Sequence, residues 1–151
     1  MSQPIVLLIF YSRSGSTEKL ALAAAVGAVQ RRALIRLRRL PDVDPARTIA
    51  EFPEARETLV RMHKEYVAPA EADILAADAI IFATPANLKT SGEWKPYLDL
   101  LARLRSEGRL DGKIVATLEP AGGLKEAEAV ERATEQGRRV ADKALELKRA
   151  L

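Results

Sequence analysis

Residues 5–17 read Ile-Val-Leu-Leu-Ile-Phe-Tyr-Ser-Arg-Ser-Gly-Ser-Thr, and this stretch decides the fold class. Its first seven residues are apolar, β-branched or aromatic without alternation, which is the pattern of a strand covered by helices on both faces. The Ser/Gly cluster ends that strand, and the Ala-rich segment from Thr17 to about Gln30 has helical spacing. The stretch therefore predicts a strand, a tight loop and a helix of an α/β protein.

The rest of the chain repeats this alternation of strand and helix. Short apolar runs predict further strands at Ala33–Leu37, Ala79–Ala83 and Lys113–Leu118. Apolar residues at helical spacing predict helices at 53–66, after Pro69, from Glu93 to about Arg105, and from Val130 to Leu151, while the Pro and Asp residues at 41–45 are expected to break regular structure. Strands that alternate with helices pair in parallel through right-handed crossovers. We therefore expect an α/β fold with a doubly wound parallel sheet and helices on both of its faces.

Composition limits the chemistry that is open to this chain. Its 151 residues, 48% hydrophobic and 30% charged, suit one globular domain over residues 1–151. Cysteine is absent, which excludes disulfides and thiolate chemistry, so redox chemistry would need a cofactor. No apolar stretch approaches the roughly 20 residues of a membrane span, so we expect no membrane partner and a cytoplasmic protein.

The positive charges do not indicate a nucleic-acid partner. The net charge is only +3, and the excess is dispersed along the chain. In the densest basic run, Arg31 to Arg39, arginines alternate with apolar residues. We interpret this run as a strand that carries solvated charges, and expect no nucleic acid to bind.

The segment Ser12-Arg13-Ser14-Gly15-Ser16-Thr17 is the best candidate for a binding site. In open parallel sheets, ligands bind beyond the carboxyl ends of the strands. Here hydroxyls and free backbone N–H groups would meet at the positive end of the next helix, and Gly15 would allow a tight turn around an anion. The segment therefore favours a phosphate monoester, although Ser14 or Ser16 could instead merely cap the helix. Arg13 could pair with the phosphate or point into solvent.

Two more loops follow strands at the same edge. The loop 84–92 could hold a flat ring through backbone amides and the side of Leu88 or Asn87, or it could be an ordinary loop that ends in a Ser91 cap. The loop Glu119-Pro120-Ala121-Gly122-Gly123 could approach a ligand closely through its glycines, or it could be a flexible exit.

Other residues with chemical potential have simpler interpretations. His63 is the single histidine and stands among charged residues, so we interpret it as solvated. Trp94 and Tyr97 lie at helical spacing with leucines, which predicts core packing, with Trp94 at the edge of a ring pocket as the alternative. No carboxylate pair, metal-ligand cluster or Ser/His/Asp set appears elsewhere, so hydrolytic catalysis has little support.

At these residues the chain resembles flavodoxin-like proteins, and most of all the NAD(P)H:quinone oxidoreductases of the tryptophan-repressor-binding-protein type. The resemblance rests on I-F-Y-S-R-S-G-S-T-E-K-L-A at 9–21, on A-D-A-I-I-F-A-T-P-A-N-L-K-T-S-G-E-W-K-P-Y-L-D at 77–99, and on G-K-I-V-A-T-L-E-P-A-G-G at 112–123. Together these segments cover about a third of the chain.

The resemblance implies an oxidoreductase with non-covalent FMN, with NAD(P)H as co-substrate and with a quinone or similar small molecule as acceptor. The flavin would carry the chemistry, so no side chain is expected to be catalytic. The implied cofactor-binding residues are Ser12, Arg13, Ser14, Gly15, Ser16 and Thr17 at the phosphate, Pro85, Ala86, Asn87, Leu88 and Lys89 beside the isoalloxazine, and Glu119 and Gly122 in the third loop.

Two departures from that family bear on these expectations. Glu119 and Pro120 stand where the family has a Ser/Thr/Gly-rich loop, and the chain passes from Gly123 almost directly into its last helix, so that the family's fifth strand is missing. The remaining four strands would have the order 2-1-3-4, with the fourth strand exposed at an edge, so we expect either a dimer or a segment that covers this edge. For the whole protein we expect a homo-oligomer, a dimer or a tetramer. Two alternatives are a flavodoxin-like binding or regulatory module without flavin and a one-electron flavodoxin carrier.

Overall fold

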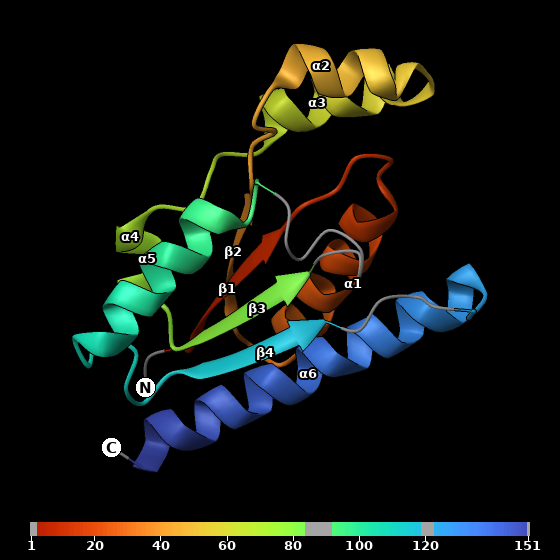
Figure 1. Cartoon of the computed structure of the whole chain (residues 1–151). Helices are drawn as coiled ribbons and strands as arrows, with labels where there is room; N and C mark the ends of the chain where they lie inside the picture. Colours follow the sequence, from red (N-terminus) through yellow and green to blue (C-terminus); the bar gives the residue numbers. More distant parts are fainter. Residues whose placement is uncertain (1–2, 84–91, 119–122, 151) are drawn as a thin grey trace.

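The computed structural model describes residues 3–83, 92–118 and 123–150. Its centre is a parallel sheet of four strands, β1 (Ile5–Phe10), β2 (Leu34–Arg39), β3 (Ala79–Ala83) and β4 (Ile114–Leu118). They lie in the order β2-β1-β3-β4, as Figure 1 shows. The predicted α/β class, the parallel pairing and the strand order 2-1-3-4 are therefore confirmed.

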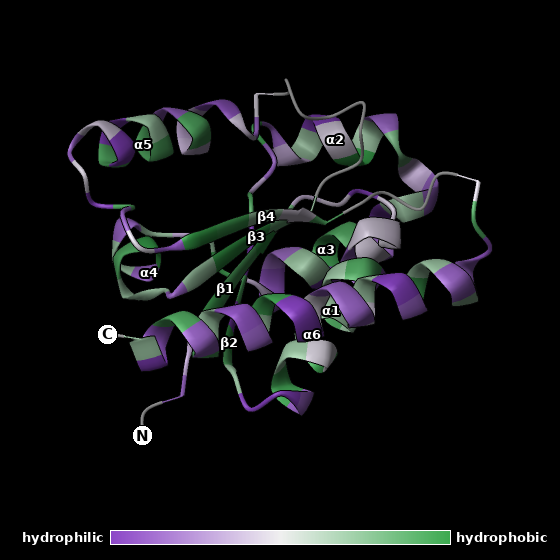
Figure 2. Ribbon diagram, turned by 90° about the horizontal axis from the view of Figure 1, so that it is seen from below, coloured by the Kyte–Doolittle hydropathy of each residue, from purple (hydrophilic) through white to green (hydrophobic). Residues whose placement is uncertain are grey.

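Helices cover both faces of the sheet. Alternate residues of β1 point to opposite sides, so Val6, Leu8 and Phe10 pack with α1 (Ser16–Gln30) and α6 (Glu126–Ala150). Leu7 and Ile9 pack on the other side with α4 (Glu71–Ala76) and α5 (Lys95–Ser106). Figure 2 shows α5 on one side of the apolar strands and α1 with α6 on the other. The continuous apolar run of β1 thus follows from its burial on two faces.

The break in regular structure expected at 41–45 is confirmed for residues 41–44, which lie in no helix or strand. Pro45 differs from the expectation, because it is the first residue of α2 (Pro45–Glu51). Asp44 is its N-cap and accepts a hydrogen bond from the N–H of Arg47 at 3.1 Å, while Pro45 occupies the first turn. An Asp cap followed by Pro is a helix start signal, and the sequence reasoning treated both residues only as breakers.

The amphipathic helix predicted at 53–66 is present as a short 3₁₀ turn, η1 (Pro53–Ala55), followed by α3 (Arg56–Glu65). Leu59 and Met62 are buried on its inner face. Figure 1 shows α2 and α3 beyond the carboxyl end of β1. There Phe10, the last residue of β1, meets Tyr66 edge to face, with ring centroids 4.9 Å apart. This helical unit therefore lies at the end of the sheet where the ligand loops begin.

Helices α1 and α6, which cover the same face of the sheet, pack with their backbones in close contact. A Cβ on Gly27 of α1 would lie 2.0 Å from the carbonyl oxygen of Thr134, and a Cβ on Gly137 of α6 would lie 2.0 Å from that of Ala24. The two glycines thus let each helix backbone rest on the other. Helix α6 begins at Glu126, earlier than the predicted Val130, and its buried residues include Ala133, Gly137, Ala141 and Ala144.

Within residues 3–83, 92–118 and 123–150, no helix is both long and apolar enough to cross a bilayer.

We predict that Gly27→Ala or Gly137→Ala lowers the free energy of unfolding by about 1–3 kcal/mol, because the added methyl forces α1 and α6 apart. Urea denaturation monitored by circular dichroism measures this effect. Gly123→Ala is the control, since a Cβ there meets no atom within 4 Å, and it should change stability by less than about 0.5 kcal/mol. Equal stability of all three variants and the wild type would contradict this account of the packing.

Candidate functional site

The loop between β1 and α1 turns at Gly15, which has the left-handed backbone conformation with φ 98° and is the N-cap of α1. The N–H of Gly15 donates a hydrogen bond to the Oγ of buried Ser12 at 3.0 Å. Within the described part of the chain, no side chain caps the helix. The alternative that Ser14 or Ser16 serves as a helix cap is therefore wrong.

This loop leaves donors directed away from the protein. The first N–H groups of a helix lack partners within the helix, and the helix dipole makes that end positive. Ser14 and Ser16 are exposed, and their hydroxyl oxygens lie 3.2 Å apart. Thr17 is buried at the base of the loop. Neighbouring hydroxyls and the N–H groups of a first helical turn together form the donor set that an anion with several oxygens requires.

Arg13 does not point into solvent, and its pairing with the phosphate stays a prediction. Its Nε donates a hydrogen bond to the Tyr11 hydroxyl at 3.1 Å, and its guanidinium lies over the Phe52 ring at 5.1 Å from the centroid. A carboxylate oxygen of Glu93 lies 4.0 Å from the guanidinium. Arg13 thus folds back against the segments after β2 and before α5, rather than extending into solvent.

The buried carboxylate of Asp42 stabilises the start of the loop. Asp42, which follows β2, has a fully buried side chain and accepts hydrogen bonds from the Tyr11 hydroxyl and from Arg39 Nη2, the latter at 3.3 Å. The same Nη2 donates to the carbonyl oxygen of Ser12 at 2.7 Å. Burial, followed by the bond to Asp42, raises the pKa of Tyr11. These buried contacts fix the start of the loop, because a charged group buried without its partners is costly.

Two interpretations of charged residues are corrected by these contacts. Arg39 is buried rather than solvated, and Arg38 of the same basic run donates to Asp73 at 3.1 Å. His63 is not a free surface histidine, because its Nε2 lies 2.6 Å from the carboxylate of Asp42 and only 28% of its side chain is exposed. The spacing Arg39-x-x-Asp42 at the end of a strand was a usable signal, whereas nothing in the sequence indicates the contact between His63 and Asp42.

A second set of polar contacts joins α3 to the first turn of α1. Glu18 is nearly fully buried there and accepts hydrogen bonds from both terminal nitrogens of Arg61, at 2.6 and 2.9 Å. The Tyr66 hydroxyl donates to the same carboxylate at 2.6 Å. The bond to Arg61 lowers the pKa of Glu18 below its ordinary value. Sequence reasoning missed all three residues, because they are separated along the chain and match no motif.

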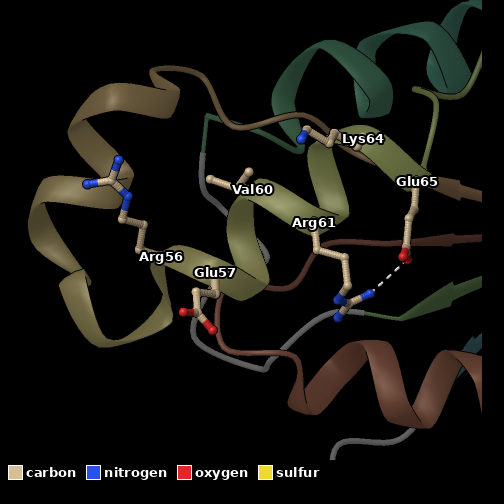
Figure 3. A pocket seen from close by; sticks show the side chains of 6 residues that line it. All are labelled: Arg56, Glu57, Val60, Arg61, Lys64 and Glu65. Atoms are coloured by element: carbon tan, nitrogen blue, oxygen red, sulfur yellow. Dashed lines mark hydrogen bonds and ion pairs between the residues drawn. The ribbon is translucent and has the colours of Figure 1, made fainter.

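Helix α3 also touches the loop directly. A Cβ on Gly15 would lie 3.3 Å from the Cγ2 of Thr58 and 3.8 Å from a carboxylate oxygen of Glu18. A pocket of about 510 Å³ lies beside α3, and its described lining residues, drawn in Figure 3, are Arg56, Glu57, Val60, Arg61, Lys64 and Glu65.

The remaining predicted residues separate into two groups. Trp94 and Tyr97 are buried and pack edge to face with Phe82 of β3, which confirms the predicted core role. The second group lies outside the described residues, so the structure does not test its predicted contacts with the cofactor. It consists of Pro85, Ala86, Asn87, Leu88, Lys89, Glu119 and Gly122.

Comparison with solved structures agrees with this architecture. A flavodoxin from Streptococcus pneumonia TIGR4 superposes with a TM-score of 0.56 at 16% identity, covering 92% of this chain and 99% of that one. An archaeal flavodoxin superposes with a TM-score of 0.53 at 13% identity, covering 93% and 98%. At such low identity these likenesses establish the flavodoxin-like fold alone.

Curated proteins match the sequence of this chain at higher identity than these two structures do. The chain is 35% identical over 112 residues to an NAD(P)H dehydrogenase (quinone) of Archaeoglobus fulgidus, covering 74% of this chain and 58% of that protein. A protein of the same name from Acidithiobacillus ferrooxidans is 34% identical over 115 residues, covering 72% and 52%. The chain thus spans about half the length of the curated relatives it matches. The family model described as NADPH-dependent FMN reductase matches residues 5–144, so the chain belongs to that family.

Proposed function

We propose that this chain binds FMN non-covalently at the loop 12–17 and uses NAD(P)H to reduce a small acceptor such as a quinone. The observation that carries the proposal is the left-handed turn at Gly15, which places the N-terminus of α1 beyond the carboxyl end of the central strand. Membership of the NADPH-dependent FMN reductase family supports the cofactor. The names of the relatives, NAD(P)H dehydrogenase (quinone), support the donor and the acceptor.

The described part of the loop fits the phosphate of FMN. The hydroxyls of Ser14 and Ser16 are exposed and adjacent, and the first N–H groups of α1 point out of the helix. The absence of a side chain at Gly15 keeps the turn clear of Thr58. In this proposal Ser14, Gly15, Ser16 and Thr17 contact the phosphate, while Ser12 and Arg13 brace the loop through their contacts with Gly15 and Tyr11.

The proposal assigns the ring of the flavin to the two other loops at this edge. Pro85, Ala86, Asn87, Leu88 and Lys89 would flank the isoalloxazine, and Glu119 and Gly122 would border it. FMN, when bound, supplies the hydride chemistry, and the protein supplies position and electrostatics. Binding and orientation are thus the tasks of the chain's own residues, and no side chain is assigned as an obligatory acid or base.

We predict that purified protein quenches the fluorescence of added FMN, unfolds at a higher temperature when FMN is present, and then oxidises NADPH with a quinone. Titration with FMN measures the dissociation constant. No quenching and no thermal shift in excess FMN would overturn the proposed function.

Variants of two glycines separate the site from general stability. Gly15→Ala places a side chain at φ 98° against Thr58, and Gly112→Ala places one at φ 79° with no atom within 4 Å. Both should cost about 1–2 kcal/mol of stability through the left-handed backbone. The Gly15 variant should also weaken FMN binding by roughly tenfold, equivalent to about 1.4 kcal/mol, whereas the Gly112 variant should not.

The proposal includes the assembly and the setting of the chain. We propose one flavodoxin-like domain over residues 1–151, a cytoplasmic protein, and a homo-oligomer, dimer or tetramer, formed through β4. In the described sheet β4 has a neighbour on one side only. Val115 of β4 is 51% exposed, although its register partner Ile80 in β3 is fully buried. An edge of this kind invites pairing with another chain.

Sedimentation velocity tests the assembly. At micromolar concentration the wild type should sediment with at least twice the mass of the chain, and Val115→Lys should shift it toward the monomer, because a charge on an edge strand opposes pairing. Val43→Lys is the control, since Val43 is similarly exposed but lies outside the sheet. A wild type that sediments only as a monomer would refute the proposed oligomer.

A further inference from the structure

A buried carboxylate, that of Glu18, lies beside the phosphate loop. Glu18 lies in the first turn of α1, and one of its oxygens would be 3.8 Å from a Cβ on Gly15. An acidic side chain is favourable at a helix N-terminus for the same reason that a phosphate is, because both interact with the positive end of the dipole. Glu18 therefore interacts with the same positive helix end that would attract an anion, and its negative charge would repel that anion.

The structure supplies a counter-charge for Glu18 from a different element. Arg61 of α3 meets the carboxylate with both terminal nitrogens, in the two-bond geometry that favours arginine over lysine. Tyr66, directly after α3, donates a third hydrogen bond to it. Arg61 also pairs with Glu65 at 2.8 Å, which Figure 3 shows as a dashed line.

We propose that Arg61 is a positioning residue for the phosphate site: by neutralising Glu18, it allows the first turn of α1 to accept the phosphate of the cofactor. This inference rests on the proposed function, because it concerns the same site. It assigns to α3 a role beyond packing, since the helix brings the compensating charge to a loop that it also touches through Thr58. Arg61 itself does not contact the phosphate in this proposal.

The test compares two ligands that differ only in the phosphate. Calorimetric titrations with FMN and with riboflavin give the ratio of their affinities, which isolates the contribution of the phosphate from that of the ring. Arg61→Gln leaves the Glu18 charge without its counter-ion, so it should lower this ratio by roughly tenfold or more. A merely structural role would weaken both ligands alike and leave the ratio unchanged.

A double-mutant cycle makes the inference specific to the charge of Glu18. Glu18→Gln should leave the ratio at least as high as in the wild type, and Glu18→Gln combined with Arg61→Gln should restore the ratio that Arg61→Gln alone lowers. Arg47→Gln is the matched control, because Arg47 pairs with Glu51 on α2 with the same i,i+4 spacing as Arg61 and Glu65. It should leave the ratio unchanged.

The possible outcomes distinguish the two claims. A wild type that binds neither FMN nor riboflavin overturns the proposed function together with this inference. A wild type that prefers FMN, with the same preference in folded Arg61→Gln protein, overturns the inference alone. If Arg61→Gln does not fold by circular dichroism, Glu18→Gln decides, because a fall in the ratio of FMN to riboflavin affinity in that variant contradicts repulsion by Glu18.

Discussion

The left-handed turn at Gly15 is the constraint on which the site depends. With φ 98° it takes the chain from the buried end of β1 into α1 within a few residues, and no side chain of the described residues caps the N-terminus of the helix. Glycine is suited to this backbone conformation because it has no Cβ. The same lack of a side chain lets α3 approach the turn through Thr58. Gly15 thus determines both the backbone of the site and the close approach of α3 to it.

Two buried carboxylates secure the surroundings of that turn. Asp42 forms hydrogen bonds with Tyr11, Arg39 and His63 next to the loop. Glu18 accepts hydrogen bonds from Arg61 and Tyr66 at the first turn of α1. Both sets draw a partner from α3 or the residue after it. Because a buried charge is tolerated only with partners, each set restricts where α3 can lie. Polar contacts therefore hold α3 next to the loop, in addition to the packing of its apolar face.

The fold was largely predictable from the sequence, whereas the polar surroundings of the site were not. The uninterrupted apolar run at 5–11 and the alternation of strands with helices led to the parallel sheet, because burial on both faces leaves a pattern in the sequence. Asp44-Pro45 also carried a local signal, which was interpreted as a break instead of a helix start. By contrast, the pairs His63 with Asp42 and Arg61 with Glu18 are set by tertiary packing, and a charged residue looks the same in sequence whether it is solvated or buried.

The central claim is that the first turn of α1 is where the cofactor phosphate binds. It is tested most directly by following the backbone amide resonances of ¹⁵N-labelled protein during a titration with FMN and, separately, with inorganic phosphate. The account predicts that both ligands shift the amides of Ser14, Gly15, Ser16 and Thr17, and that FMN alone shifts further residues. Shifts with FMN that leave these four amides unchanged would contradict it.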